Sequence, residues 1–148
     1  MSMTTDQLRG VLADTFHLYF RSHVFHWNVV GVLFPQLHDF FGKIYTQTWG
    51  ELDVIAEHIR ACGVLAPSSI STLMGFTNVA PKESTPGTSK EMIEELMALN
   101  TTLLGSLAIA RNAAEDEKKR GVVNFLEGLL DAHEKMDWML KVTLQEQP

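Results

Sequence analysis

Apolar residues recur every three or four positions along most of the chain, which is the spacing of helices that bury one face. This rhythm predicts four long helices. Thr4 and Gln7 have the spacing of a capping box at the start of the first helix, which ends at Gly31. The second helix begins near Pro35, a residue suited to a first helical turn, and stops near Gly63.

The segment between the second and third helices, residues 64–87, is rich in Pro, Ser, Thr and Gly. It predicts a long connection with a short helical turn at Ser69–Met74. Thr88 and Glu91 form a second capping-box pattern before the third helix, and the fourth helix covers Val122–Leu140. Two helix pairs with short links, joined by one long connection, predict an all-α, ferritin-like four-helix bundle with a crossover that carries a short helix.

Composition and charge narrow the class of protein. The chain has 148 residues, with 12 Lys and Arg against 18 Asp and Glu, a net charge of −6. We expect one domain over residues 1–148, with no membrane-spanning segment. Met1–Gln7 lacks the pattern of a secretory signal, and Cys62 has no second cysteine to pair with, so we expect a cytoplasmic protein. Neither Met1–Gln7 nor Gln145–Pro148 contains a basic residue, so DNA binding through the termini is not expected.

Four residues form a candidate metal centre: His26, His38, Asp53 and Glu57. Asp53 and Glu57 are four residues apart, so both carboxylates project from one face of the second helix. His26 lies shortly before Gly31 and His38 shortly after the turn, so the helical hairpin can bring the two imidazoles together. Two imidazoles and two carboxylates suit iron, zinc or manganese.

The helix geometry adds a condition to this hypothesis. His38 and Asp53 are fifteen residues apart, about 22 Å along a straight helix, and so cannot bind one ion within a chain. If two copies of the second helix pair antiparallel about a dyad near Thr46, His38 of one chain meets the carboxylates of the other. Gly42 and Gly50 then face each other and permit a close approach. The metal hypothesis is therefore also a dimer hypothesis.

Plainer interpretations exist for the same residues. Two carboxylates at this spacing are typical of a solvated helix face, and a histidine on an apolar face, such as His17 or His23, is typical of a packed core. We assign His58 and His133 to either the surface or the core. The spacing alone leaves both interpretations open.

The series His26-Trp27-Asn28, Gly31, Leu37-His38, Asp53 and Ala56-Glu57 resembles the Dps family of mini-ferritins over essentially the whole chain. The resemblance implies a shell of twelve subunits that oxidises Fe(II), typically with hydrogen peroxide and otherwise with dioxygen, and stores ferric iron inside. It also implies an enzyme, a ferroxidase, with His26 and His38 from one subunit and Asp53 and Glu57 from its neighbour. Zinc or manganese are possible substitutes for iron.

The chain departs from the family pattern in two places. Many members carry an acidic residue one turn after the second histidine, where this chain has Gly42. Acidic residues that line the pores through which iron enters are matched here by Lys119 or Arg120 and by Asn124. Two other functions therefore stay open: a Dps-like shell that protects the nucleoid with weakened or absent ferroxidase activity, and a monomeric helical bundle that acts as an interaction module.

Overall fold

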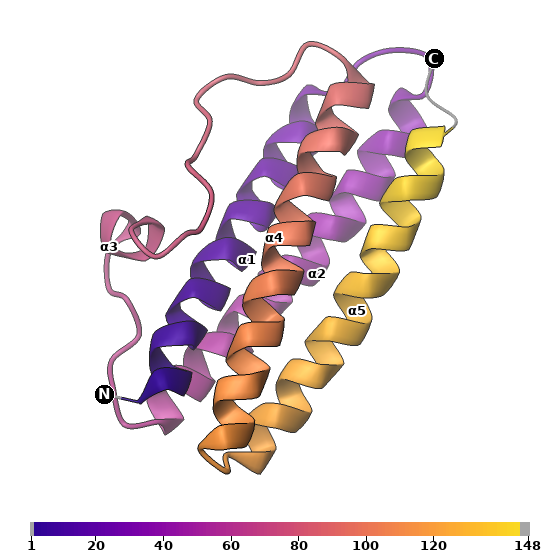
Figure 1. Cartoon of the computed structure of the whole chain (residues 1–148). Helices are drawn as coiled ribbons and strands as arrows, with labels where there is room; N and C mark the ends of the chain where they lie inside the picture. Colours follow the sequence, from indigo (N-terminus) through magenta and orange to yellow (C-terminus); the bar gives the residue numbers. More distant parts are fainter. Residues whose placement is uncertain (1, 146–148) are drawn as a thin grey trace.

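The computed structural model describes residues 2–145, and the regular secondary structure within them is entirely α-helix. The helices in chain order are α1 (Met3–Asn28), α2 (Phe34–Ala61), α3 (Ile70–Met74), α4 (Ser89–Asp116) and α5 (Arg120–Gln145). Four long helices lie side by side, and the connection with α3 runs along the outside of α1 (Figure 1). This is the ferritin-like bundle that the apolar pattern predicted.

Local sequence signals set the starts of several helices. Pro35 lies in the first turn of α2, and Thr88 caps α4 by accepting a hydrogen bond from the Glu91 N–H. The capping box predicted at Thr4 and Gln7 is wrong, because Ser2 is the N-cap of α1 and its hydroxyl accepts from the Thr5 N–H. Thr4 has a different partner, a carboxylate at the end of α4.

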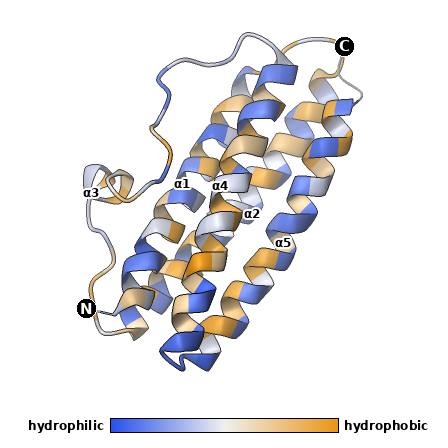
Figure 2. Cartoon of the chain, in the orientation of Figure 1, coloured by the Kyte–Doolittle hydropathy of each residue, from blue (hydrophilic) through white to orange (hydrophobic). Residues whose placement is uncertain are grey.

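The core forms where the four long helices face one another (Figure 2). α1 packs against α2 and α4, and α4 packs against α5. Each long helix contributes fully buried apolar side chains, among them Leu8, Phe25, Phe41, Ile55, Leu96, Leu103, Leu126 and Leu140. By length and composition α4 could cross a membrane, but its apolar face belongs to this core, which makes it weak evidence for a membrane location.

Two buried charges on α1 fasten the crossover to the bundle. The Asp14 carboxylate accepts hydrogen bonds from the Thr77 hydroxyl (2.8 Å), the Asn78 N–H (2.9 Å) and the Ser106 hydroxyl (2.6 Å). The Arg21 guanidinium pairs with Glu95 on α4 at 2.6 Å and donates to the Ser84 carbonyl at 2.8 Å. The long connection is therefore held by directional bonds to α1 and α4.

The start of α1 is tied to the end of α4 through Glu117. Its carboxylate accepts hydrogen bonds from the Thr4 hydroxyl, the Thr4 N–H and the Met3 N–H. These bonds, those of the Thr4 hydroxyl first and then of its N–H, hold the pKa of Glu117 below its ordinary value. The carboxylate also faces the positive end of the α1 dipole.

We expect Glu117→Gln to remove a pH-dependent part of the stability. Because the pKa is lower in the folded protein, the charged form stabilises the fold above the ordinary glutamate pKa, and this contribution is lost as the pH falls through the folded value. Thermal unfolding between pH 3 and 7 measures it. The melting temperatures of the two proteins should differ near neutral pH and converge in acid; a constant difference would contradict the assignment.

Candidate metal centre

The two predicted histidines meet where α1 ends and α2 begins. The rings of His26 and His38 stack with their centroids 3.7 Å apart and their planes 17° from parallel. Nδ1 of His26 lies 2.6 Å from the His38 carbonyl oxygen, and Nδ1 of His38 lies 2.7 Å from the His26 carbonyl oxygen. The hairpin predicted from Gly31 and Pro35 therefore brings the two imidazoles together.

These reciprocal bonds fix which nitrogen of each ring is available to a metal. A carbonyl oxygen only accepts, so Nδ1 must carry the proton in His26 and in His38. The lone pair of each neutral ring is then on Nε2, and neither Nε2 has a hydrogen-bond partner among the described residues. An imidazole held by a backbone carbonyl on one nitrogen and free on the other is the usual arrangement of a histidine metal ligand.

Gly42 leaves room for the His26 ring against α2. A Cβ atom at position 42 would lie 3.2 Å from both Cε1 and Nδ1 of His26. The ring cannot easily yield, because its Nδ1 is bonded to the His38 carbonyl and its face is stacked on His38. The departure from the acidic pattern is thus accompanied by close packing of His26 on the glycine.

Asp53 and Glu57 lie further along α2, and both are exposed. The described residues include no salt-bridge partner for either carboxylate. Asp53 borders a largely apolar hollow that is also lined by Phe16, Trp49 and Leu73. The two carboxylates are therefore free to accept a ligand from outside the chain.

The structure does not bring the histidines and the carboxylates together within one chain. α2 is continuous from Phe34 to Ala61, so the helical rise keeps His38 and Asp53 about 22 Å apart. Among the described residues, no group of three or more His, Cys, Asp or Glu side chains is arranged to hold a metal ion. Each chain carries two separate halves of the candidate centre.

Aromatic side chains surround the histidine half. His23 stacks on Tyr45 with centroids 3.8 Å apart, and Tyr45 meets His26 edge-on at 5.1 Å. Burial, and then the electrostatic interaction with His26, lower the pKa of His23. On the same side of the bundle Trp27 and Trp49 are 58% and 61% exposed, which is unusual for residues of this size.

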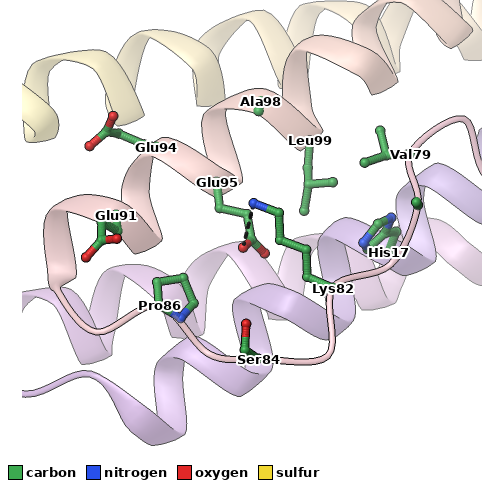
Figure 3. A pocket seen from close by; sticks show the side chains of 11 residues that line it. His17, Val79, Lys82, Ser84, Pro86, Glu91, Glu94, Glu95, Ala98 and Leu99 are labelled. Carbon is green, nitrogen blue, oxygen red and sulfur yellow. Dashed lines mark ion pairs between the residues drawn. The ribbon is translucent and has the colours of Figure 1, made fainter.

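A separate pocket of about 520 Å³ lies between α1, α4 and the crossover (Figure 3). None of the four predicted ligands lines it. His17 is buried there, and desolvation lowers its pKa, whereas Glu95 is already paired with Arg21 and approached by Lys82 at 3.7 Å. The prediction of a core position for His17 is confirmed, and the main carboxylate of this pocket is not free to bind a metal.

The turn between α4 and α5 carries the basic residues that depart from the family pattern. Lys118 has a left-handed backbone with φ of 58°, and Lys119 and Arg120 line a hollow beside it. The acidic residues of this hollow, Glu115 and Glu127, both pair with Arg111. The lining is therefore mixed in charge.

The sequence interpretation missed one polar cluster inside the bundle. His133 on α5 is 1% exposed and contacts Glu51 on α2 and Asn100 on α4. The sequence left His133 between a surface and a core position, and the structure places it in the core. No local sequence pattern indicates the role of Glu51, because its partner His133 lies 82 residues away in the chain.

Known proteins of one family have a similar sequence and a similar fold. The ferritin-like domain family matches residues 5–147. The DNA protection during starvation protein of Brevibacillus brevis is 34% identical over 98% of this chain and 100% of that protein. The crystal structure of a Dps protein from Bacillus brevis is 27% identical with a TM-score of 0.84, over 97% of this chain and 99% of that one.

A Dps structure from Vibrio cholerae, described as a member of the ferritin-like diiron-carboxylate superfamily, is 25% identical with a TM-score of 0.89 over 95% of this chain and 88% of that one. The chain therefore belongs to the ferritin-like family. Within that family it is a member of the Dps group, as the histidine and carboxylate series predicted.

Proposed function

We propose that this protein is a ferroxidase that oxidises Fe(II), preferentially with hydrogen peroxide, at a centre shared by two subunits, and stores ferric iron in a hollow shell of twelve subunits. The observation that carries the proposal is the locked histidine pair, whose two Nε2 atoms are free while each Nδ1 donates to a backbone carbonyl. Membership of the ferritin-like family supports iron as the substrate.

The second half of the centre comes from a partner chain in this proposal. When two α2 helices pair antiparallel about a dyad near Thr46, His38 of one chain approaches Asp53 and Glu57 of the other. A Cβ at Gly50 would meet no other atom within 4 Å, so this part of α2 is open for a close neighbour. The exposed Trp27 and Trp49 supply apolar surface that a second subunit would bury.

The donor set suits the oxidation of iron. Carboxylates are hard anionic ligands that favour Fe(III), whereas neutral imidazoles also bind Fe(II). Two Fe(II) ions each give one electron to a peroxide molecule, its O–O bond breaks, and water supplies the other oxygens of two FeOOH units with release of four protons. Two-electron reduction of peroxide at one site avoids the hydroxyl radical that a single electron would produce. Zinc or manganese could occupy the same ligands.

The name of the Brevibacillus relative favours a second candidate function, a shell that protects DNA without fast iron oxidation. Gly42 is the observation behind it, because the centre lacks one carboxylate of the family pattern. We expect no DNA contact through the basic-poor termini, of which Met1 and residues 146–148 lie outside the described residues. A cytoplasmic location and the twelve-subunit shell remain parts of the proposal.

Anaerobic titration of Fe(II) into the metal-free protein, with and without hydrogen peroxide, separates the two functions. The ferroxidase should consume two Fe(II) per peroxide and yield little spin-trapped hydroxyl radical. A protective shell without a centre would leave the oxidation rate and the radical yield as they are in buffer.

We expect Glu57→Gln to slow peroxide-driven oxidation by about 10- to 100-fold. The amide keeps the shape of the side chain but loses the charge that would bridge two ions. Stopped-flow absorbance measures the rate, and light scattering should show an unchanged particle because the amide has the same size and shape as the carboxylate. Glu134→Gln, an exposed glutamate on α5, is the matched control and should behave like the unmodified protein.

A further inference from the structure

A polar cluster inside the bundle connects α2 to α4 and α5. His133 Nε2 lies 2.8 Å from Glu51 Oε1, and His133 Nδ1 lies 2.8 Å from Asn100 Oδ1. The Asn100 amide donates to the His133 carbonyl at 2.9 Å, which fixes its orientation. Both ring nitrogens therefore face oxygen acceptors, and the imidazole is held between α2 and α4 in one orientation.

This cluster attaches the middle of α2 to α5 through a hydrogen bond, which has a preferred direction. The large buried apolar residues of α2 are Leu37, Phe41 and Ile44 before its central turn, and Ile55 and Ile59 after it. The buried side chain between these two groups is Thr48, whose hydroxyl bonds to the carbonyls of its own helix. Among the described residues, Glu51 is the position in the central turns of α2 whose side chain hydrogen-bonds to α5.

The direction of Glu51 determines where the candidate ligands point. At about 100° per residue, His38, Asp53 and Glu57 lie about 140°, 200° and 240° around the helix from Glu51. All three ligands on α2 therefore lie on the side opposite Glu51. A rotation of α2 about its axis would move all of them relative to a neighbouring subunit.

We infer that Glu51 and His133 are positioning residues, which hold the rotation of α2 so that the histidine and carboxylate halves of two subunits converge on one metal ion. The inference rests on the proposed function. A second contact supports it: the Gln47 amide donates to Glu51 Oε2 at 3.1 Å, and Gln47 lines the hollow that contains His26 and His38. Gln47 on α2 therefore connects Glu51 to the hollow of the histidine pair.

Two pairs of variants test the inference through Zn²⁺ binding to the assembled, metal-free protein, measured by calorimetry. Glu51→Gln can still meet both His133 and Gln47, so its Zn²⁺ affinity should stay within about twofold of the unmodified protein. Glu51→Asp keeps the charge but withdraws the carboxylate by about one C–C bond, 1.5 Å, and should weaken Zn²⁺ binding by about 10- to 100-fold. A role for the Glu51 charge itself would give the opposite order.

Two variants at His133 on α5 compare a side chain that keeps the contact with Glu51 and one that loses it, while Glu51 itself is unchanged. The amide of His133→Gln lies near the place of Nε2 and keeps the contact with Glu51, whereas that of His133→Asn lies near the place of Nδ1 and reaches only Asn100. We expect near-normal Zn²⁺ affinity for His133→Gln and a loss of about 10-fold or more for His133→Asn. If Glu51→Asp does not assemble, this second pair decides the question.

Leu126→Ala controls for loss of stability alone, because Leu126 is fully buried on α5 and its loss should lower the melting temperature without changing Zn²⁺ affinity. Equal affinities for Glu51→Asp and Glu51→Gln, or for the two His133 variants, would overturn the positioning role. A comparable affinity loss in Leu126→Ala would also overturn it. An unmodified shell that binds no Zn²⁺ would instead refute the proposed centre, and the positioning role with it.

Discussion

Alanine at His38 or at Asp53 is expected to slow peroxide-driven Fe(II) oxidation by at least about 100-fold, because either change removes a ligand from every centre in the shell. The two positions are equivalent in this respect although they lie about 22 Å apart on α2. Initial rates in stopped-flow mixing measure the loss. His58→Ala, which removes a histidine of α2 that stacks on Phe125, is the matched control and should retain the unmodified rate.

Mixing the two inactive variants before assembly should restore part of the activity. In a mixed dimer one centre combines both damaged ligands and the other combines both intact ones. Random pairing makes half of the dimers mixed, and half of their centres intact, so about a quarter of the normal rate should return in a twofold-symmetric assembly. A shell that forms normally from mixed chains but regains no activity would show that the centre is not shared.

Glu95→Ala is expected to have the largest effect on stability, a loss of about 3–5 kcal/mol in the free energy of unfolding. Arg21 and Glu95 are both buried, and removal of the carboxylate leaves the guanidinium charge inside the protein without its ion partner. The Arg21 bond to the Ser84 carbonyl would remain, which leaves the crossover only partly fastened. Equilibrium unfolding in urea measures the loss.

Two further variants test whether the unpaired charge of Arg21 causes the loss of stability. Lys82→Ala removes the other cation near Glu95, but Lys82 is 65% exposed, so its loss should cost at most about 1 kcal/mol. The double variant Arg21→Met with Glu95→Leu replaces the pair by apolar side chains and should recover much of the stability lost in Glu95→Ala. If the single and double variants were equally unstable, the unpaired charge would not be the cause.

Much of the fold could be predicted from the sequence because its signals are local. The three-to-four residue rhythm, Pro35 and Thr88 indicate where helices run and begin, and the structure confirms them. The error at Thr4 has a physical reason. Its hydroxyl and N–H are engaged by Glu117, more than a hundred residues away, while Ser2 does the capping.

Only part of the candidate site could be predicted from the sequence. Spacing within the hairpin predicts that His26 and His38 meet, and the structure confirms this contact. Spacing does not show which ring nitrogen is free, because that depends on the carbonyl each Nδ1 meets across the turn. The Glu51–His133 contact likewise joins distant helices and leaves no periodic trace in the chain. The role of Asp53 and Glu57 as ligands from a second subunit stays a prediction.

The most direct test of the shared centre is a crystal structure of the assembled protein with Zn²⁺, in which anomalous scattering locates the ion. We predict a peak about 2.0–2.2 Å from Nε2 of His26 or His38 and from carboxylate oxygens of Asp53 or Glu57 of the partner subunit. Zn²⁺ bound only by residues of a single chain, or absent from the interface between two α2 helices, would contradict it.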